Sequence, residues 1–110
     1  MSSSQASLAG QWNQLRLSGI IIKPPRLFRS PSGVSHLKFV LEHKSEQVEA
    51  NLPRRSYVRI NIVFSGQQAD FWSEKLKQSD AVTVEGFLNR EEDSSGQGKL
   101  VLHAQQLVKI

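Results

Sequence analysis

Apolar residues alternate with other residues along much of this chain, and a period of two is the spacing of a half-buried β-strand. The pattern is clearest in residues 35–45, SHLKFVLEHKS, where Leu37, Phe39 and Leu41 fall on one side. The other side carries Lys38, Val40, Glu42 and Lys44. Four further segments rich in Val, Ile and Leu complete a set of five predicted strands: residues 14–23, 56–65, 81–90 and 99–110.

Three stretches of different composition separate these strands. Residues 23–33, KPPRLFRSPSG, carry three prolines and end in Ser-Gly, which predicts a loop. Residues 45–55, SEQVEANLPRR, are expected to connect the second and third strands. Residues 90–99, REEDSSGQGK, are polar and glycine-rich, so we expect a mobile loop between the fourth and fifth strands.

One segment, residues 65–80, departs from the β pattern. Ala69, Trp72 and Leu76 are three and four residues apart, which is the apolar stripe of a helix. Asp70 falls in the expected first turn, and Lys75 and Lys77 in the last, as the helix dipole favours. We therefore predict one short helix, with Trp72 packed into the core rather than binding a ligand.

The order of these elements predicts the fold. Three strands, a helix and two strands in about a hundred residues indicate an all-β protein, a five-stranded Greek-key barrel of the OB-fold type. Gly19 and Gly86 lie inside strands, where glycine marks a bulge or tight bend of a small barrel. We expect a single domain at residues 13–110, preceded by a flexible, Ser-rich tail at residues 1–12.

Composition limits the chemistry. The chain has no cysteine, which fits a reducing, cytoplasmic setting, and no apolar run long enough to span a membrane. The formal net charge is +4, but residues 16–59 carry nine basic and three acidic side chains, whereas residues 60–110 carry five and seven. A basic half indicates an anionic partner.

The outer faces of the predicted strands supply candidate residues for that partner. OB folds bind oligonucleotides on the second and third strands and on the flanking loops. Alternation places Val58, Ile60, Ile62 and Phe64 of the third strand in the core, and Tyr57, Arg59, Asn61 and Val63 outside. The candidate nucleic-acid-binding residues from these strands and loops are Arg26, Phe28, Arg29, Lys38, Lys44, Arg54, Arg55, Tyr57 and Arg59.

This mixture of side chains suits a single strand. Lys and Arg neutralise phosphates and release counterions, and aromatic rings stack on unpaired bases. Other roles stay open: Tyr57 as a cross-strand packing residue, Phe28 as a cap of the barrel end or a dimer contact, and the loop arginines as solubilising charge.

Catalysis and metal binding find little support. No phosphate-binding G-x-x-x-x-G-K-[ST] loop or G-x-G-x-x-G run is present. The three histidines lack ligand spacing, and His43 shares the parity of the core residues, which favours a near-core histidine. Glu91, Glu92 and Asp93 are interpreted as a solvated charge run. We expect no enzymatic activity, no metal and no cofactor.

Several segments resemble the primosomal replication protein N family, PriB. They are SPSGVSHLKFVLEHKS and KLVLHAQQL, supported by LRLSGIIIKPP, IVFSG and VTVEGFL, and the resemblance extends over residues 13–110. It implies a small OB-fold homodimer, without catalytic activity, that binds single-stranded DNA in replication restart. It also implies that the protein stimulates the PriA helicase and, as in some lineages, helps to recruit the DnaT protein.

The resemblance adds site residues by position. It implies binding roles for the basic residues Lys44, Arg54 and Lys99, and for Tyr57, where the family usually has Trp. The loop at residues 90–98 departs from the family, because relatives are often Lys-rich where this chain has Glu91, Glu92 and Asp93. We expect this loop to contribute less to DNA binding or to serve a protein contact, with the DNA path shifted towards the second and third strands.

Two other functions compete with this one. The chain could be a protein-interaction OB adaptor with weak DNA binding, a reading that the acidic loop favours. An RNA-binding protein of the cold-shock type ranks lower, because its aromatic cluster is missing. For the dimer we expect the edge of the first strand, where Ile20, Ile21 and Ile22 cannot all face one core; the alternative buries all three between barrel and loop.

Overall fold

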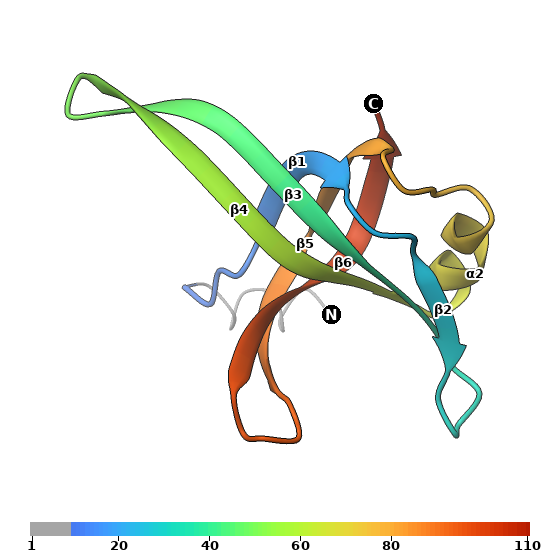
Figure 1. The fold of residues 1–110 in the computed structure, drawn as a ribbon. Coiled ribbons are helices and arrows are strands. Elements are labelled where there is room, and N and C mark those ends of the chain that lie inside the picture. Colours follow the sequence, from blue (N-terminus) through green and yellow to red (C-terminus); the bar gives the residue numbers. More distant parts are fainter. Residues whose placement is uncertain (1–9) are drawn as a thin grey trace.

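A computed structural model describes residues 10–110 (Figure 1). In chain order its elements are β1 (Leu15–Ile21), β2 (Arg26–Arg29), β3 (Ser35–Glu49), β4 (Leu52–Ser65), α2 (Gln67–Ser73), β5 (Ala81–Glu92) and β6 (Gly98–Lys109). No helix among these residues has the length and hydropathy needed to cross a membrane. The tail predicted at residues 1–12 falls mostly on residues 1–9, which lie outside the described residues.

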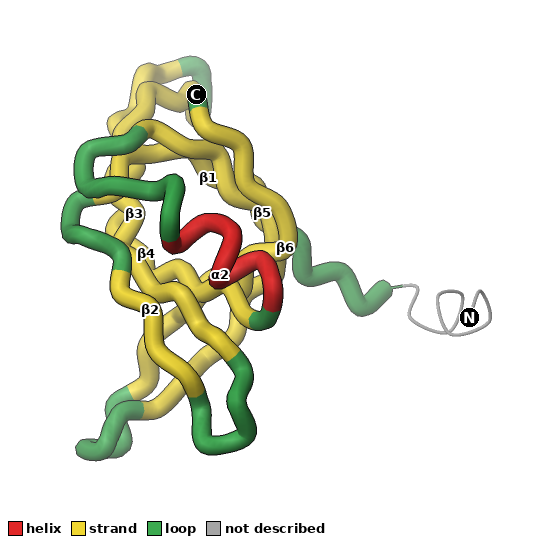
Figure 2. The backbone as a smooth tube through the Cα atoms, turned by 90° about the vertical axis from the view of Figure 1, so that its right-hand side faces the viewer, coloured by secondary structure: helices red, strands yellow, loops and turns green. Residues whose placement is uncertain are grey.

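Five strands close into a ring. Their order is β1-β5-β6-β4-β3, and β1 pairs again with β3 at Ile20 and Ile21, while β2 is added to the outer edge of β3. All pairs are antiparallel except β4 with β6. Figure 2 shows α2 among the strands of the ring, and the helix packs against β3, β2 and β4. This confirms the predicted OB-fold architecture with one short helix between the third and fourth barrel strands.

The core follows the alternation seen in the sequence. Leu37, Phe39 and Leu41 of β3 are buried, as are Ile62 and Phe64 of β4. β5 and β6 contribute Val82, Val84 and Leu102 from their inner faces. Apolar burial of this kind is the main stabilising contribution to a small barrel.

The interior glycines Gly19 and Gly86 stand where two strands approach closely. A β-carbon at Gly86 would collide with the backbone carbonyl of His103, and one at Gly19 with that of Glu42. The register also shifts between Glu85 and Gly86, which is a β-bulge. Both glycines therefore allow two backbones to approach closely, and the predicted bulge is found at Gly86.

The connection predicted at residues 45–55 is wrong. β3 and β4 stay paired from Ser45 with Ser56 to Glu49 with Leu52, and only Ala50 and Asn51 form the turn. Both turn residues have positive φ, 53° and 61°, as a two-residue hairpin turn requires. The end of this hairpin projects from the barrel (Figure 1) and both of its faces are exposed, so its sequence lacks apolar alternation.

The proline-rich loop contains a short strand. β2 lies between Pro25 and Pro31 and pairs with β3 from Arg26 opposite Lys38 to Arg29 opposite Ser35. All four of its residues are exposed. An edge strand without a buried side has no hydrophobic period, which explains why the sequence predicted only a loop.

The helix and the last loop are shorter than predicted. α2 buries Ala69 and packs the half-buried Trp72 against the core, as expected. It ends at Ser73, so Lys75 and Lys77 lie beyond it and the predicted basic last turn is absent. β5 and β6 extend to Glu92 and from Gly98, which leaves a connection of residues 93–97.

Candidate nucleic-acid interface

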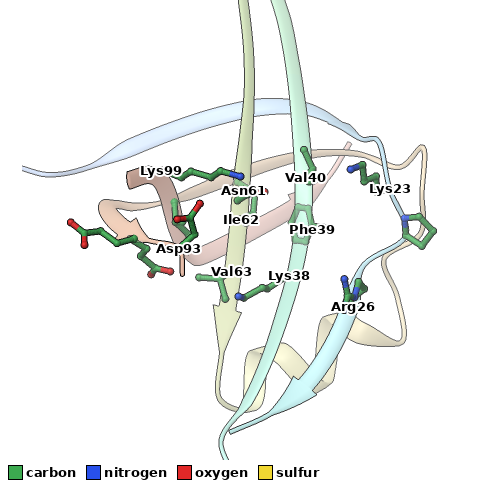
Figure 3. Close-up of a pocket in the computed structure, with 14 residues that line it drawn as sticks. Lys23, Arg26, Lys38, Phe39, Val40, Asn61, Ile62, Val63, Asp93 and Lys99 are labelled. Atoms are coloured by element: carbon green, nitrogen blue, oxygen red, sulfur yellow. The ribbon is translucent and has the colours of Figure 1, made fainter. Parts of the chain in front are cut away.

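A groove of about 410 Å³ crosses the outer face of β3 and β4 (Figure 3). One wall is the segment that follows β1, and the other is the β5–β6 hairpin. Phe39, Val40, Asn61, Ile62 and Val63 form its floor. The groove thus lies where an OB fold presents its strands and loops to an oligonucleotide.

Basic side chains surround the groove. Lys38 and Arg26 come from the paired strands β3 and β2, and Lys99 from β6. Lys23 completes the set, although sequence reasoning had assigned it only to the end of the first strand. A second hollow shares Lys23, Val40, Asn61 and Lys99 with the first and continues it towards the exposed Arg59. Together the two hollows form one groove along β4, called the basic lane below. The basic residues that line it are Lys23, Arg26, Lys38, Arg59 and Lys99.

A cluster of four side chains adjoins this lane and shares Arg59 with it: Tyr57, Lys44, Arg59 and Glu42. The Tyr57 hydroxyl and an Arg59 nitrogen both donate to Oε2 of Glu42, at 2.8 and 2.9 Å. Lys44 Nζ lies 5.8 Å from the centre of the Tyr57 ring and 3.9 Å from the Glu42 carboxylate. Tyr57 is 55% exposed, so the Glu42 carboxylate holds an open aromatic ring in a cluster with two cations.

Glu42 is the member of the cluster that sequence reasoning did not single out. The hydrogen bond from Arg59, and next that from Tyr57, holds the pKa of its carboxyl below the ordinary value. The carboxylate is therefore ionised at neutral pH and offsets part of the positive charge of this face. The register across β3 and β4, with Glu42 opposite Arg59 and Lys44 opposite Tyr57, is the signal that reveals the cluster.

Phe28 lies against the outward-facing His36 and Lys38 of β3. Its ring is 44% exposed and stacks on His36, with centroids 5.2 Å apart and planes 30° apart. Lys38 Nζ is 5.0 Å from the centre of the Phe28 ring. A second aromatic-cation pair thus stands at the β2 edge of the groove.

The remaining arginines divide between two places. Arg55 lines a hollow with Lys44 and Tyr57, so it joins the cluster. Arg54 lies on the projecting hairpin and pairs with Glu49 at 3.4 Å, and Arg29 reaches towards Asp70 at 3.9 Å. The structure therefore brings Arg55 to the candidate interface, while Arg29 and Arg54 line none of the three hollows.

The three acidic residues line the groove itself. Glu91 bonds His103 at 2.8 Å, and Glu92 pairs with Arg90 at 2.8 Å. Asp93 accepts hydrogen bonds from the Ser95 hydroxyl and from the backbone N–H groups of Gln97 and Ser95, which lower its pKa. Each carboxylate thus has an internal partner, and Asp93 holds the turn between β5 and β6.

Two further expectations have clear outcomes. Val63 lies on the outer face, as predicted, and lines the groove, but it is only 6% exposed because β6 pairs alongside it, with His103 opposite. His43 is half-buried and both ring nitrogens are bonded, Nδ1 to the Ser18 carbonyl and Nε2 to the Ser45 hydroxyl, each at 2.7 Å. This confirms His43 as a satisfied near-core histidine.

The chain is similar in sequence to proteins of DNA metabolism. The family model "Another single-strand binding protein family" matches residues 13–106. The "Replication restart protein PriB" of Vibrio parahaemolyticus is 42% identical over 98 residues, 89% of this chain and 98% of that protein. The protein of the same name from Photobacterium profundum is 45% identical over 95 residues, 86% of this chain and 91% of that protein.

Solved structures show the same fold at lower identity. PriB from Ralstonia solanacearum superimposes with a TM-score of 0.72 at 20% identity, over 90% of this chain and 99% of that one. The single-stranded DNA binding protein from Thermus aquaticus gives a TM-score of 0.77 at 21% identity over 90% of this chain. This chain spans 50% of that protein.

Proposed function

This chain belongs to the single-strand binding protein family and, within it, to the replication restart PriB proteins, and from that premise we propose that it holds single-stranded DNA on the outer face of β3 and β4. The observation that carries the proposal is the basic lane with Tyr57 at its end. Lys23, Lys38, Lys99 and Arg59 border a groove along one face, and an exposed ring stands beside them.

The chemistry of this face suits an unpaired strand. The lysines and arginines replace counterions along the phosphates, so affinity falls as salt rises. The open rings of Tyr57 and Phe28 stack on unpaired bases, which a duplex does not offer. The face therefore favours single strands over duplexes and has little preference among sequences.

We further propose that the protein acts in the cytoplasm as a non-enzymatic primosome accessory, stimulating the PriA helicase and in some settings contacting DnaT. The residues expected to bind DNA are those named from the sequence: Arg26, Phe28, Arg29, Lys38, Lys44, Arg54, Arg55, Tyr57, Arg59 and Lys99. Relatives at 42–45% identity named for replication restart support this role.

A homodimer is part of the proposal. β1 pairs with β5 through Ile20 but with β3 only at Ile20 and Ile21, so among the described residues Leu15 to Gly19 have no strand partner on that edge, where only the Ser18 carbonyl is bonded, by His43. Ile21 is buried and Ile20 is 42% exposed, which rules out the alternative that all three isoleucines are buried. The open edge supports the first strand as the dimer contact, because an unpaired edge is a template for pairing with a second chain.

The protein-interaction adaptor remains a second candidate. The observation in its favour is that Glu91, Glu92 and Asp93 line the same groove as the basic residues. Carboxylates there repel a phosphate backbone and suit a basic peptide instead.

Fluorescence anisotropy with a labelled oligothymidine of ~30 nucleotides, long enough for several OB-fold sites, separates the two candidates. The titration is repeated with a duplex, at two salt concentrations and with Tyr57→Ala. The DNA-binding proposal predicts salt-sensitive binding of the single strand only, weakened by Tyr57→Ala. Weak or strand-indifferent binding, together with binding to the helicase, contradicts it and favours the adaptor.

A further inference from the structure

Two stacked rings lie on the outside of β5 and β6. Phe87 and His103 are opposite each other across the strand pair, with centroids 4.9 Å apart and planes 3° from parallel. Leu88 and Leu102 pack in or against the core, so alternation directs Phe87 and His103 outward, and Phe87 keeps 37% of its surface exposed. A cross-strand aromatic pair supports a sheet by itself, so a binding role depends on what surrounds the pair.

Glu91 contacts this aromatic pair through His103 and also lines the groove. Its carboxylate is 2.8 Å from His103 Nε2, and Glu91 also lines the groove across β3 and β4. Because a carboxylate only accepts, Nε2 carries the proton of this hydrogen bond. The bond holds the imidazole in one orientation at the border of the groove, and the imidazole in turn lies flat against Phe87.

The pair also ends a row of residues that crosses the sheet. In register, Arg26 lies opposite Lys38, Lys38 opposite Val63, Val63 beside His103, and His103 opposite Phe87. Figure 3 shows the first three of these at the groove. With strands about 4.8 Å apart, the row spans roughly 19 Å along the curved surface. It has cations at one end, a small apolar residue in the middle and stacked rings at the other end.

We propose that Phe87 and His103 form a further base-contacting site, which takes an unpaired nucleobase of a strand whose phosphates lie on Lys38 and Arg26. This inference rests on the proposed single-strand binding. The inference adds where each part of the nucleotide lies along the row. The phosphates contact β2 and β3, and the base stacks on β5 and β6. Tyr57 lies six residues along β4 from Val63, roughly 20 Å away, so the two aromatic sites contact different nucleotides.

The test compares Phe87→Leu with a matched control, Phe71→Leu. Phe71 is an exposed aromatic on α2, outside the row. Stacking of a base on one ring predicts a loss of about five- to tenfold in affinity for oligothymidine from Phe87→Leu, with the salt dependence unchanged, and no loss from Phe71→Leu. Equal affinity of both variants and the wild type overturns the inference.

Photocrosslinking of the wild-type protein covers the case in which Phe87→Leu fails to fold. The probe is an oligothymidine carrying 5-bromodeoxyuridine, and the adducts are mapped by mass spectrometry. Adducts on Phe87 or His103 support the inference, and adducts confined to Tyr57 and Phe28 overturn it. Absence of any salt-sensitive oligothymidine binding by the wild type refutes the proposed function, and this inference with it.

Discussion

Replacing Glu42 with Gln tests how the charge on the interface is set. Glu42 accepts hydrogen bonds from Tyr57 and Arg59 and lies 3.9 Å from Lys44 Nζ. A phosphate that binds Arg59 or Lys44 competes with this carboxylate. The amide oxygen of Gln still accepts from Tyr57 and Arg59, so the variant removes the negative charge and keeps the geometry.

The expected result is tighter binding with a steeper salt dependence. Losing an exposed ion pair changes an equilibrium constant by a factor of about two to five. We expect a gain of that size in the affinity for oligothymidine at low salt. If one more phosphate is neutralised, the slope of log affinity against log salt steepens by about 0.7, the value for single strands. The assay is fluorescence anisotropy at four salt concentrations.

Glu85→Gln is the matched control. Glu85 pairs with Arg16 across β1 and β5, and its side chain is 27% exposed, close to the 20% of Glu42. It changes the net charge of the protein equally. The reasoning is refuted if Glu42→Gln and Glu85→Gln bind alike, or if Glu42→Gln binds more weakly with a shallower slope.

Four other predictions follow from the same geometry. Lys23→Gln reduces the salt slope by about 0.7 if Lys23 contacts a phosphate, and an unchanged slope in the same titration shows that it does not. Exchanging Glu91, Glu92 and Asp93 for Lys tightens oligothymidine binding, since all three line the groove; unchanged affinity places the hairpin off the DNA path. Gly86→Ala lowers the urea midpoint, because a β-carbon there meets the His103 carbonyl, and the free energy of unfolding drops by more than the ~1 kcal/mol of a typical substitution. Since folding lowers the pKa of Glu42, its stabilising contribution is complete above the ordinary carboxyl pKa and disappears as pH falls through the lowered value. Urea midpoints of wild type and Glu42→Gln should therefore converge in acid, and a constant difference contradicts this.

The fold was predictable wherever a strand has one buried face. Phe39 and Phe64 alternate with exposed neighbours because β3 and β4 pack against a core there. The same strands continue as a two-stranded ribbon, where Val48 is 78% exposed and no face is buried, so the period vanishes although the pairing continues. β2 was not predicted for the same reason. All of its side chains are exposed, and backbone pairing alone produces no periodic pattern of apolar side chains.

The candidate site was predictable in part. Parity along β4 placed Tyr57 and Arg59 outside, and the structure finds both exposed on one face. Glu42 bonds both Tyr57 and Arg59 because of the register between β3 and β4. The length of the turn sets this register, and the sequence predicted a longer connection than the two-residue turn of the structure. Lys23 was missed because the closure of the barrel brings it to the same groove as Lys99, from a distant part of the sequence.

The central claim is that the outer face of β3 and β4 binds single-stranded DNA, and backbone amide chemical shifts measured by NMR during an oligothymidine titration test it most directly. The account predicts that shift changes gather on residues 36–44 and 57–63 and at Lys23 and Lys99. Changes gathered on α2 instead, or no saturable changes at any residue, would contradict it.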